Sequence, residues 1–366
     1  MASSQISRSD RIVGLWLWLT AALVFLLVVV GGATRLTESG LSIVEWRPVT
    51  GSIPPVSAQS WQAEFEKYKA IPQYTEVNRG MSLEEFKTIY WWEWAHRFLG
   101  RLVGAAFFLP FLVFLWRGWI RPEFRWPLWG IFALGGLQGA VGWWMVTSGL
   151  AERVSVSQYR LAFHLTLACV IYALLVWYAR RHAPDRPVHA SPRHAASAAG
   201  IVVLVLIQIY LGALVAGTDA GMVFNTWPLI DGHLVPEASR LFFETPLWRN
   251  FFENTLTVQF VHRMCAYLLW SCALLHMLDV WRSGRRREVL AGAAGVAMLV
   301  TVQAGIGIAT LLEVSPLGLS LLHQAMAVAV LTVALVHAER LSGRRTAAQA
   351  RFQPAAGPAA GRSAAG

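Results

Sequence analysis

Long apolar runs separated by short polar segments make up most of the sequence. Eight of these runs approach the roughly 20 residues that a helix needs to cross a bilayer. The runs at 92–116 and 257–281 open with polar residues and are the least lipid-like. The pattern predicts an all-α integral membrane protein whose eight transmembrane helices cover residues 13–33, 92–116, 127–147, 160–179, 198–217, 257–281, 289–311 and 317–338.

Composition supports this interpretation. Only 14% of the residues are charged and the mean hydropathy is +0.46, whereas soluble domains carry about 25% charged residues. The net charge of +10 indicates topology rather than nucleic-acid binding, because the arginines gather on alternate polar segments. We therefore expect cytoplasmic N- and C-termini in a bacterial inner membrane. The arginines on that side are Arg8, Arg11, Arg117, Arg121, Arg125, Arg180, Arg181, Arg186, Arg193, Arg282, Arg285, Arg286, Arg287, Arg340, Arg344, Arg345 and Arg351.

The sequence repeats itself. At an offset of 181, Gly31 matches Gly212, Thr37 matches Thr218 and Trp46 matches Trp227; further on, the offset falls to 159 because the first half has longer loops. Each half contains four spans, so both halves have the same orientation. The repeat predicts two tandem four-helix bundles related by a pseudo-two-fold axis along the membrane normal. The later matches are His96-Arg97 with His262-Arg263, Gln138 with Gln303, Gly142 with Gly307, and His164 with His323.

This repeat divides the chain into five parts. We expect a cytoplasmic tail at 1–12, bundles at 13–179 and 198–340, a cytoplasmic linker at 180–197, and a disordered tail at 341–366. Residues 1–12 are too short and polar for a cleaved signal, so the first span is expected to stay in the protein. The outer segments at 34–91 and 218–256 are rich in Gly and Pro, which favours turns over helix. They are expected to cap the bundles.

Four histidines lie at matched depth, one to two turns inside the outer end of alternate spans: His96, His164, His262 and His323. Polar rings in a membrane need partners, and facing helices of a bundle hold cofactors between them. The pairs His96–His164 and His262–His323 therefore predict two heme irons with two imidazole ligands each. Hydrogen-bonded core histidines remain the alternative. No Asp, Glu or Cys cluster completes another metal's ligand set within either pair.

Charged neighbours make the two pairs unequal. Glu93 lies three residues before His96 and shares its helix face, whereas Gln259 occupies the equivalent position before His262. Glu93 is thus a candidate proton acceptor or stabiliser of positive charge; the alternative is a solvated carboxylate at the interface. Arg97, Arg101 and Arg263 are candidate partners of heme propionates, because guanidinium pairs well with carboxylate.

A second histidine pattern competes with the first. His276 and His337 each follow a proposed ligand by 14 residues, about 21 Å along one helix face, and a further heme there is an alternative. We favour interfacial histidines, because the first half has Pro110 and Tyr178 instead. The other histidines, His182, His189, His194 and His233, are expected to be solvated loop residues. The sequence has no CxxCH, so covalently attached heme is excluded.

Several segments together resemble the heme A synthase family. They are GGATRLTESGLSIVEWRPVTGSIPP at 31–55, EWAHRFLGRLVG at 93–104, FHLTLA at 163–168, VHRM at 261–264 and LLHQ at 321–324. The likeness spans nearly all of 11–340. It is closer to the alphaproteobacterial and mitochondrial branch than to the branch with a cysteine pair in the first outer loop, because that pair is absent.

The resemblance implies a reaction and a ligand set. Members oxidise the C8 methyl group of heme o to a formyl group, giving heme A for terminal oxidase assembly. By motif, His96 and His164 would hold the substrate heme, Glu93 would be catalytic, and His262 with His323 would hold a permanent heme b. Heme o synthase and oxidase assembly factors are the implied partners, and a homo-oligomer is compatible with the sequence. The alternatives are a b-type quinol oxidoreductase subunit and a heme transporter or chaperone.

Overall fold

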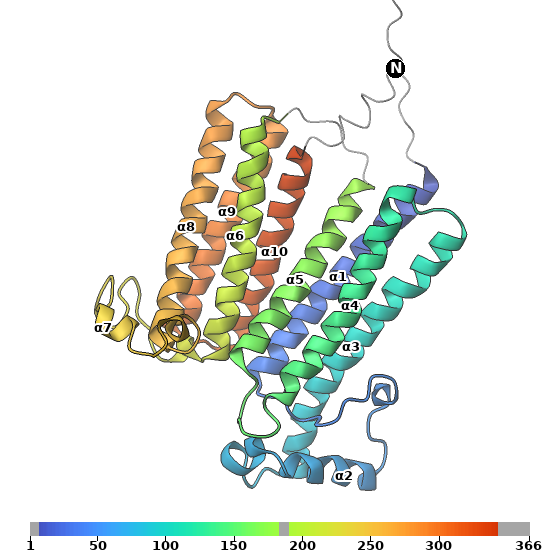
Figure 1. The fold of residues 1–366 in the computed structure, drawn as a ribbon, viewed down its shortest axis with the longest axis vertical. Coiled ribbons are helices and arrows are strands. Elements are labelled where there is room, and N and C mark those ends of the chain that lie inside the picture. Colours follow the sequence, from blue (N-terminus) through green and yellow to red (C-terminus); the bar gives the residue numbers. More distant parts are fainter. Residues whose placement is uncertain (1–6, 183–189, 343–366) are drawn as a thin grey trace, which may run out of the picture.

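The computed structural model describes residues 7–182 and 190–342 (Figure 1). Within these ranges the protein is helical, and its only extended pairing is an isolated bridge between Ile230 and His233. Eight helices contain the eight expected spans, so each expected span is confirmed as helix. They are α1 (Arg8–Leu36), α3 (Leu83–Trp116), α4 (Pro122–Thr147), α5 (Gln158–Arg181), α6 (Pro192–Gly217), α8 (Thr255–Arg282), α9 (Arg287–Leu312) and α10 (Leu317–Leu341).

Seven of these eight helices are long and apolar enough to cross a membrane, as judged over the described residues. Helix α4 does not reach that level although it has 26 residues. Its sequence includes Trp126, Trp129, Trp143 and Trp144 together with several glycines, and indole and glycine contribute less hydropathy than aliphatic side chains. These residue types are also common at membrane interfaces and in helix contacts.

Helix boundaries differ from the expectation where a cap extends a helix. Helix α3 begins at Leu83 rather than near 92, because Ser82 and Glu85 form a reciprocal capping box. Helix α6 begins at Pro192 rather than 198, where Ser191 accepts a hydrogen bond from the His194 amide. Both extensions use polar residues, which the apolar pattern cannot assign.

The expected tails and linker change accordingly. Helix α1 already starts at Arg8, so most of the polar stretch 1–12 that the structure describes is helical. The linker expected at 180–197 is shorter than predicted, because α5 continues to Arg181 and α6 starts at Pro192. Its residues 183–189 lie outside the described residues, as does the expected disordered tail beyond residue 342.

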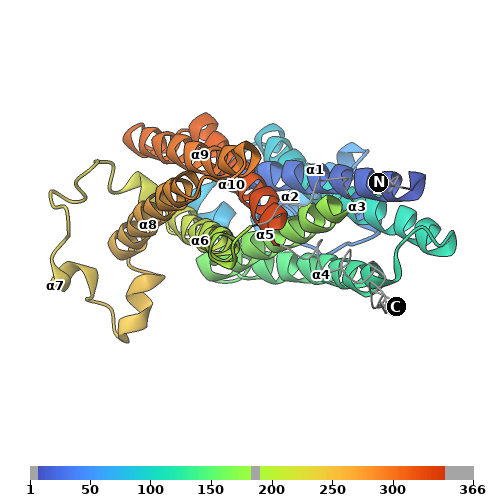
Figure 2. The ribbon, with the colours of Figure 1, turned by 90° about the horizontal axis from the view of Figure 1, so that it is seen from above.

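The long helices pack in two groups of four. Helices α1, α3, α4 and α5 contact one another in a ring, and α6, α8, α9 and α10 form a second ring. Figure 1 shows the groups side by side, with the first group inclined relative to the second, and Figure 2 shows them from above. Contacts between the groups run through α5 with α6, α5 with α10, and α1 with α10. The same four helices therefore form both the inner walls of the groups and the interface.

The interface combines an apolar core with a few polar contacts. Leu175 and Val176 of α5 and Leu331 of α10 are completely buried within one large cluster. The Tyr172 hydroxyl hydrogen-bonds with the Thr332 hydroxyl at 2.7 Å, and the Gln324 amide donates to the carbonyl of Val28 at 2.7 Å. An ion pair where α1 and α6 end joins Arg35 of α1 to Asp219 at 3.0 Å.

The sequence repeat is also a repeat of backbone conformation at the ends of α1 and α6. The Thr37 hydroxyl donates to the carbonyl of Ala33 at 2.8 Å, and the Thr218 hydroxyl donates to the carbonyl of Leu214 at 2.8 Å. The residues that follow, Glu38 and Asp219, have left-handed φ angles of 53° and 52°, a region that residues other than glycine adopt rarely. The two halves thus leave their first helix by the same turn.

The two outer segments lie at the same end of the molecule, opposite the start of α1 and the end of α10 (Figure 1). The first segment is not made of turns alone, as its Gly and Pro content had suggested. It contains η1 (Thr50–Ser52), α2 (Ala58–Lys69) and the π-helical turn η2 (Gln73–Val77). The second is closer to the expectation, with only η3 (Ala220–Met222), α7 (Ala238–Leu241) and η4 (Leu247–Phe251).

Buried polar side chains tie α2 and η2 to the turn after α1. The Tyr68 hydroxyl donates to Gln73 Oε1 at 3.1 Å and accepts from the Asn78 amide at 2.8 Å. Gln73 in turn donates to the carbonyl of Glu38. Burial raises the pKa of the Tyr68 phenol, so its hydroxyl keeps the proton that it donates. This segment is therefore a folded cap rather than a loose loop.

Candidate functional site

The four matched histidines lie on helices that stand opposite each other. His96 is on α3 and His164 on α5, and both helices pack against α1 and α4. His262 is on α8 and His323 on α10, which both pack against α6 and α9. The two imidazoles of each pair lie close enough to interact electrostatically. The structure therefore brings together the pairs His96–His164 and His262–His323, each near the capped end of its helix group.

Each of these rings lies against a glycine of an adjacent helix. A Cβ built on Gly31 or on Gly142 would lie 2.9 Å from the nearest ring atom of His96 or His164, respectively. These separations are below ordinary van der Waals contact. The glycines therefore let a helix backbone approach an imidazole that a larger residue would push away. In the second half the corresponding Cβ–ring distances are 3.2 Å for Gly212 with His262 and 2.7 Å for Gly307 with His323.

Three of the four histidines are also contacted by a glutamine side chain. The Gln138 amide donates to the carbonyl of His164 at 3.0 Å and lies 3.2 Å from its Nδ1. Gln303 makes the same contacts with His323, at 2.9 and 3.1 Å. Gln208 of α6 does so with His262, at 3.1 Å to both atoms. The same amides lie 3.4, 3.2 and 3.5 Å from Nε2 of His164, His262 and His323, so each amide lies against its imidazole ring as a whole.

Part of this arrangement was not predicted from the sequence. The repeat matches Gln138 with Gln303 but does not predict their contacts with histidines, and Gln208 was not a candidate residue. An amide in the apolar run 198–217 was the available signal, because a polar group in a membrane helix needs a partner.

The surroundings of the two pairs fit a planar iron cofactor. The four side chains are only partly buried although they lie between helices, so they face open space. An outer-shell amide beside the ring nitrogen that does not bind metal fixes the ring orientation. In the part of the chain that the structure describes, no cluster of three His, Cys, Asp or Glu side chains is arranged to hold a bare metal ion. Two imidazoles in each pair are a donor set that would suit an iron whose other ligands come from a porphyrin.

Glu93 is buried and fully hydrogen-bonded. Its Oε2 accepts from the Ser42 hydroxyl and the Ile43 amide, both at 2.7 Å, and its Oε1 accepts from Arg97 at 2.6 and 3.1 Å. Arg97 also donates to the carbonyls of Ile43 and Glu45. The solvated interfacial carboxylate that was the alternative is therefore wrong. Glu93 and Arg97 together clamp the first cap onto α3, one turn from His96.

Gln259 forms a neutral version of this clamp. Its Oε1 accepts from Arg263 at 2.7 Å, and its Nε2 donates to the carbonyls of Ala220 and Phe224 at 2.7 and 3.2 Å. Arg263 also donates to the carbonyls of Phe224 and Leu229. The first cap offers mainly donors to Glu93, whereas the second cap offers acceptors to Gln259. Part of the difference between these residues therefore follows from the caps they hold.

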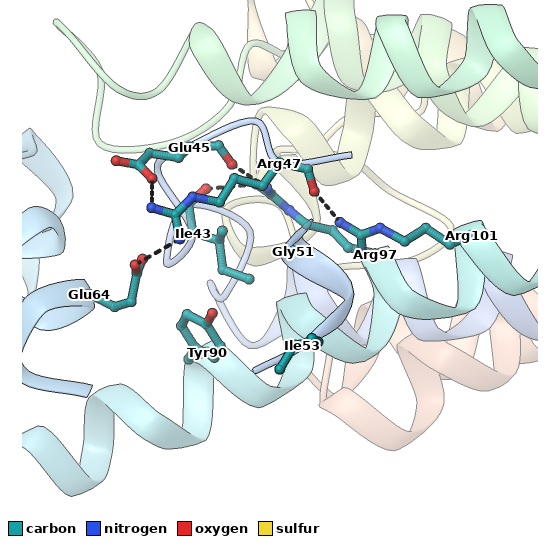
Figure 3. Close-up of a pocket in the computed structure, with 9 residues that line it drawn as sticks. All are labelled: Ile43, Glu45, Arg47, Gly51, Ile53, Glu64, Tyr90, Arg97 and Arg101. Carbon is teal, nitrogen blue, oxygen red and sulfur yellow. Dashed lines mark hydrogen bonds and ion pairs between the residues drawn. The ribbon is translucent and has the colours of Figure 1, made fainter. Parts of the chain in front are cut away.

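Arg101 extends the first clamp by another turn. Its Nε and Nη2 donate to the carbonyls of Pro48 and Arg47, both at 2.8 Å, and Gly51 lies closely against it. The side chain lines a small pocket with Arg97, Tyr90 and Glu64 under the 43–53 loop (Figure 3). This pocket has a volume of about 30 Å³, room for a water or two. It therefore belongs to the cap rather than to a porphyrin.

Two of the three candidate arginines keep a spare donor. In the described part of the chain, the buried Nη1 of Arg101 and Nε of Arg263 have no hydrogen-bond partner. All three nitrogens of the Arg97 guanidinium group are used by Glu93 and the cap. Arg101 and Arg263 thus fit a carboxylate partner better than Arg97 does.

Four of the other histidines are buried, which differs from the expectation. His276 and His337 are buried, each only 3% exposed, so they are not interfacial. Their Nε2 atoms are hydrogen-bonded at 2.9 Å, whereas an ion on the line between two imidazoles needs roughly 4 Å. His182 and His194 are also buried rather than solvated, near Asp10 and Asp279 respectively. His233 is exposed as expected, and His189 lies outside the described residues.

These features define an all-helical membrane protein with two histidine pairs at the capped ends of two helix groups. The model of the COX15-CtaA family, described as cytochrome oxidase assembly protein, matches residues 14–335. The chain therefore belongs to this family.

Relatives named heme A synthase match over nearly the full length. The protein from Rhodopseudomonas palustris strain HaA2 is 57% identical over 96% of this chain and 97% of its own. The one from Bradyrhizobium diazoefficiens is 58% identical over 96% of this chain and 98% of its own. A third, from R. palustris strain BisA53, is 54% identical over 99% of this chain and its own full length.

Proposed function

We propose that this protein is an oxidoreductase that converts the C8 methyl group of heme o to a formyl group, giving heme A. The names of its relatives support this activity. The observation that carries it is the unequal pair of histidine sites. Both pairs occur in one repeated frame, but only His96 has a carboxylate, Glu93, one turn away on its helix.

The two pairs would hold two hemes with different tasks. His96 and His164 hold the substrate heme o, and His262 with His323 hold a resident heme b. Heme b, when bound, supplies one-electron redox chemistry. The spare donors of Arg101 and Arg263 would bind propionates, while Arg97 keeps Glu93 in place.

The reaction removes protons as well as electrons from the substrate, and both must leave the site. Formally, converting a methyl to a formyl group removes four electrons and four protons and adds the oxygen of one water. Glu93 is the carboxylate nearest in sequence to the substrate ligand His96, and through Arg97 it contacts the small polar pocket under the cap. We propose that Glu93 accepts a proton there or stabilises positive charge on the substrate.

The same proposal assigns an architecture. Helix α4 is the eighth span, because it lies between the spanning helices α3 and α5 and contacts both. A two-fold axis between α5 and α10 would relate α1 to α6 and α5 to α10. It would thus relate the contact of α5 with α6 to the contact of α10 with α1. The caps then face outward, and both termini face the cytoplasm of a bacterial inner membrane. Heme o synthase and oxidase assembly factors remain the proposed partners.

Extraction of the pigment from the purified full-length protein tests this function. We expect heme b together with heme o or heme A, identified by mass analysis. Heme b alone would contradict the proposal and favour an electron-transfer cytochrome. Loosely bound heme in less than equimolar amount would favour a transporter or chaperone. The hydrogen bond between His276 and His337 predicts that no third heme is found.

A further inference from the structure

His96 differs from the other three histidines in having no glutamine. Gln208 of α6 hydrogen-bonds to His262. The residue of α1 that matches Gln208 at the offset of 181 is Leu27. Gln138 and Gln303 occupy matching positions on α4 and α9, and they hydrogen-bond to His164 and His323, respectively. Among the described residues, no side chain hydrogen-bonds to the His96 ring. Three of the four rings are thus fixed by an amide and one is not.

The His96 ring is also turned differently. A Cβ on Gly31 would lie nearest to His96 Nε2, at 2.9 Å, so this nitrogen faces the backbone of α1. At the other three sites, the atom nearest to the glycine Cβ is Cε1. This is a second observation, independent of the missing amide. The imidazole without a glutamine is the one whose Nε2 points at a neighbouring helix.

The three glutamines are suited to hold a metal-bound imidazole. Oε1 of Gln138, Gln208 and Gln303 is buried in each case and has no partner within the described chain. The Nε2 of each glutamine donates to the backbone carbonyl of its histidine and lies against the imidazole ring, so the amide holds the backbone and the ring of the ligand together. Such an outer-shell contact fixes the orientation of the ring. Leu27 has no group that could donate to the carbonyl of His96.

We propose that His96 is the exchangeable ligand of the first site. Leu27, which has no amide, leaves the His96 ring free to turn away from the heme. This proposal rests on the proposed function, which makes the first site hold a substrate that must leave as product. His164, fixed by Gln138, anchors the heme, while the His96 ring turns between the heme and the α1 backbone beside Gly31. The second site has an amide on both ligands and retains its heme. Gln208 and Leu27 are therefore positioning residues that separate a resident heme site from a substrate site.

The test measures heme release to an excess of apomyoglobin from the purified full-length protein. The variants are Leu27→Gln, which supplies the missing amide, and Gln208→Met, which removes one while keeping a similar shape. Leu27→Met is the matched control. The released heme is identified by extraction and mass analysis, and the high-spin fraction of the retained heme is read from the absorption spectrum.

We expect Leu27→Gln to slow release from the first site by about tenfold and to lower the high-spin fraction, because outer-shell partners change metal affinity by about 10–100-fold. Leu27→Met should match the unmodified protein. Gln208→Met should speed the release of heme b by about tenfold.

Equal release from Leu27→Gln and Leu27→Met would overturn the proposal, as would unchanged heme b release from Gln208→Met. If Leu27→Gln does not accumulate, the Gln208→Met result decides. A different result, heme b at both sites, would contradict the proposed function without contradicting the ligand assignment. If both sites contain heme b, its release should still be biphasic, and slowing of the faster phase by Leu27→Gln supports the ligand assignment alone.

Discussion

At the scale of single residues, Glu93 and Gln259 show how one position serves two sites. Both hold an arginine one turn later and a cap above it. Glu93 receives hydrogen bonds from Ser42 and Ile43, whereas Gln259 donates to carbonyls. A carboxylate is thus required by the donors of the first cap, independently of any role in chemistry. Separating the two roles needs a change that removes the charge together with a control for its effect on the cap, because an amide at this position places an N–H against one of these donors.

Glu93→Gln makes that change. We expect heme b content to be kept and heme A output to fall by about a hundredfold, a typical effect of losing a proton acceptor. The measurement is heme A per protein after extraction. Gln259→Glu is the matched control, because it disturbs the second clamp by placing a carboxylate against carbonyls, at a cost of about 1–3 kcal/mol. Near-normal heme A output from Glu93→Gln would show that Glu93 only holds the cap.

At the scale of helices, the approach of α4 and α9 to the ligand histidines depends on glycine. Gly142 and Gly307 are matched by the repeat, and each lies against a histidine of the next helix. Other glycines of the same helices, such as Gly305, face open space. The sequence alone does not separate these two kinds of glycine, since both occur in apolar runs.

Gly307→Ala is therefore expected to displace the His323 ring and to lower heme b retention by about tenfold or more. The added Cβ would lie 2.7 Å from His323 Cε1. Gly305→Ala, two residues away on α9, has no neighbour within 4 Å of the added Cβ and should retain heme normally, since alanine is the better helix former. Heme b per protein, measured after purification, checks both. Equal retention in the two variants would contradict the role of Gly307.

At the scale of the whole molecule, the caps and the arginine-rich connections lie at opposite ends. Arg79 is exposed in the first cap, and Arg282 is exposed at the end of α8. The positive-inside rule places Arg282 in the cytoplasm and Arg79 outside. We expect a membrane-impermeant maleimide to label Arg79→Cys in intact spheroplasts, and to label Arg282→Cys only after the membrane is opened.

The same type of residue is replaced in both variants, so labelling efficiency can be compared directly. The native Cys169, Cys265 and Cys272 lie in helices, and the unmodified protein gives the background. Labelling of Arg282→Cys in intact spheroplasts would reverse the proposed orientation.

The sequence by itself determined the helices, the repeat and the four histidines. Apolar runs of membrane length predict helices because the backbone must satisfy its own hydrogen bonds in lipid, and a repeat of matched residues predicts matched structure. Thr37 and Thr218 end their helices in the same way, as the repeat implied. The apolar pattern did not reveal α2 in the first cap or the early start of α3, because both begin at serine N-caps, Ser57 and Ser82, outside the long apolar runs.

Only the tertiary structure decided what surrounds each histidine. The partners of His262, Gln208 and Gly212, lie one turn apart on α6, whereas His262 itself lies on α8. Spacing along one helix cannot show which residue of another helix meets it, because that depends on how far apart the helices pack. For the same reason, the mutual hydrogen bond of His276 and His337 and the missing amide at His96 were visible only once the helices were placed side by side.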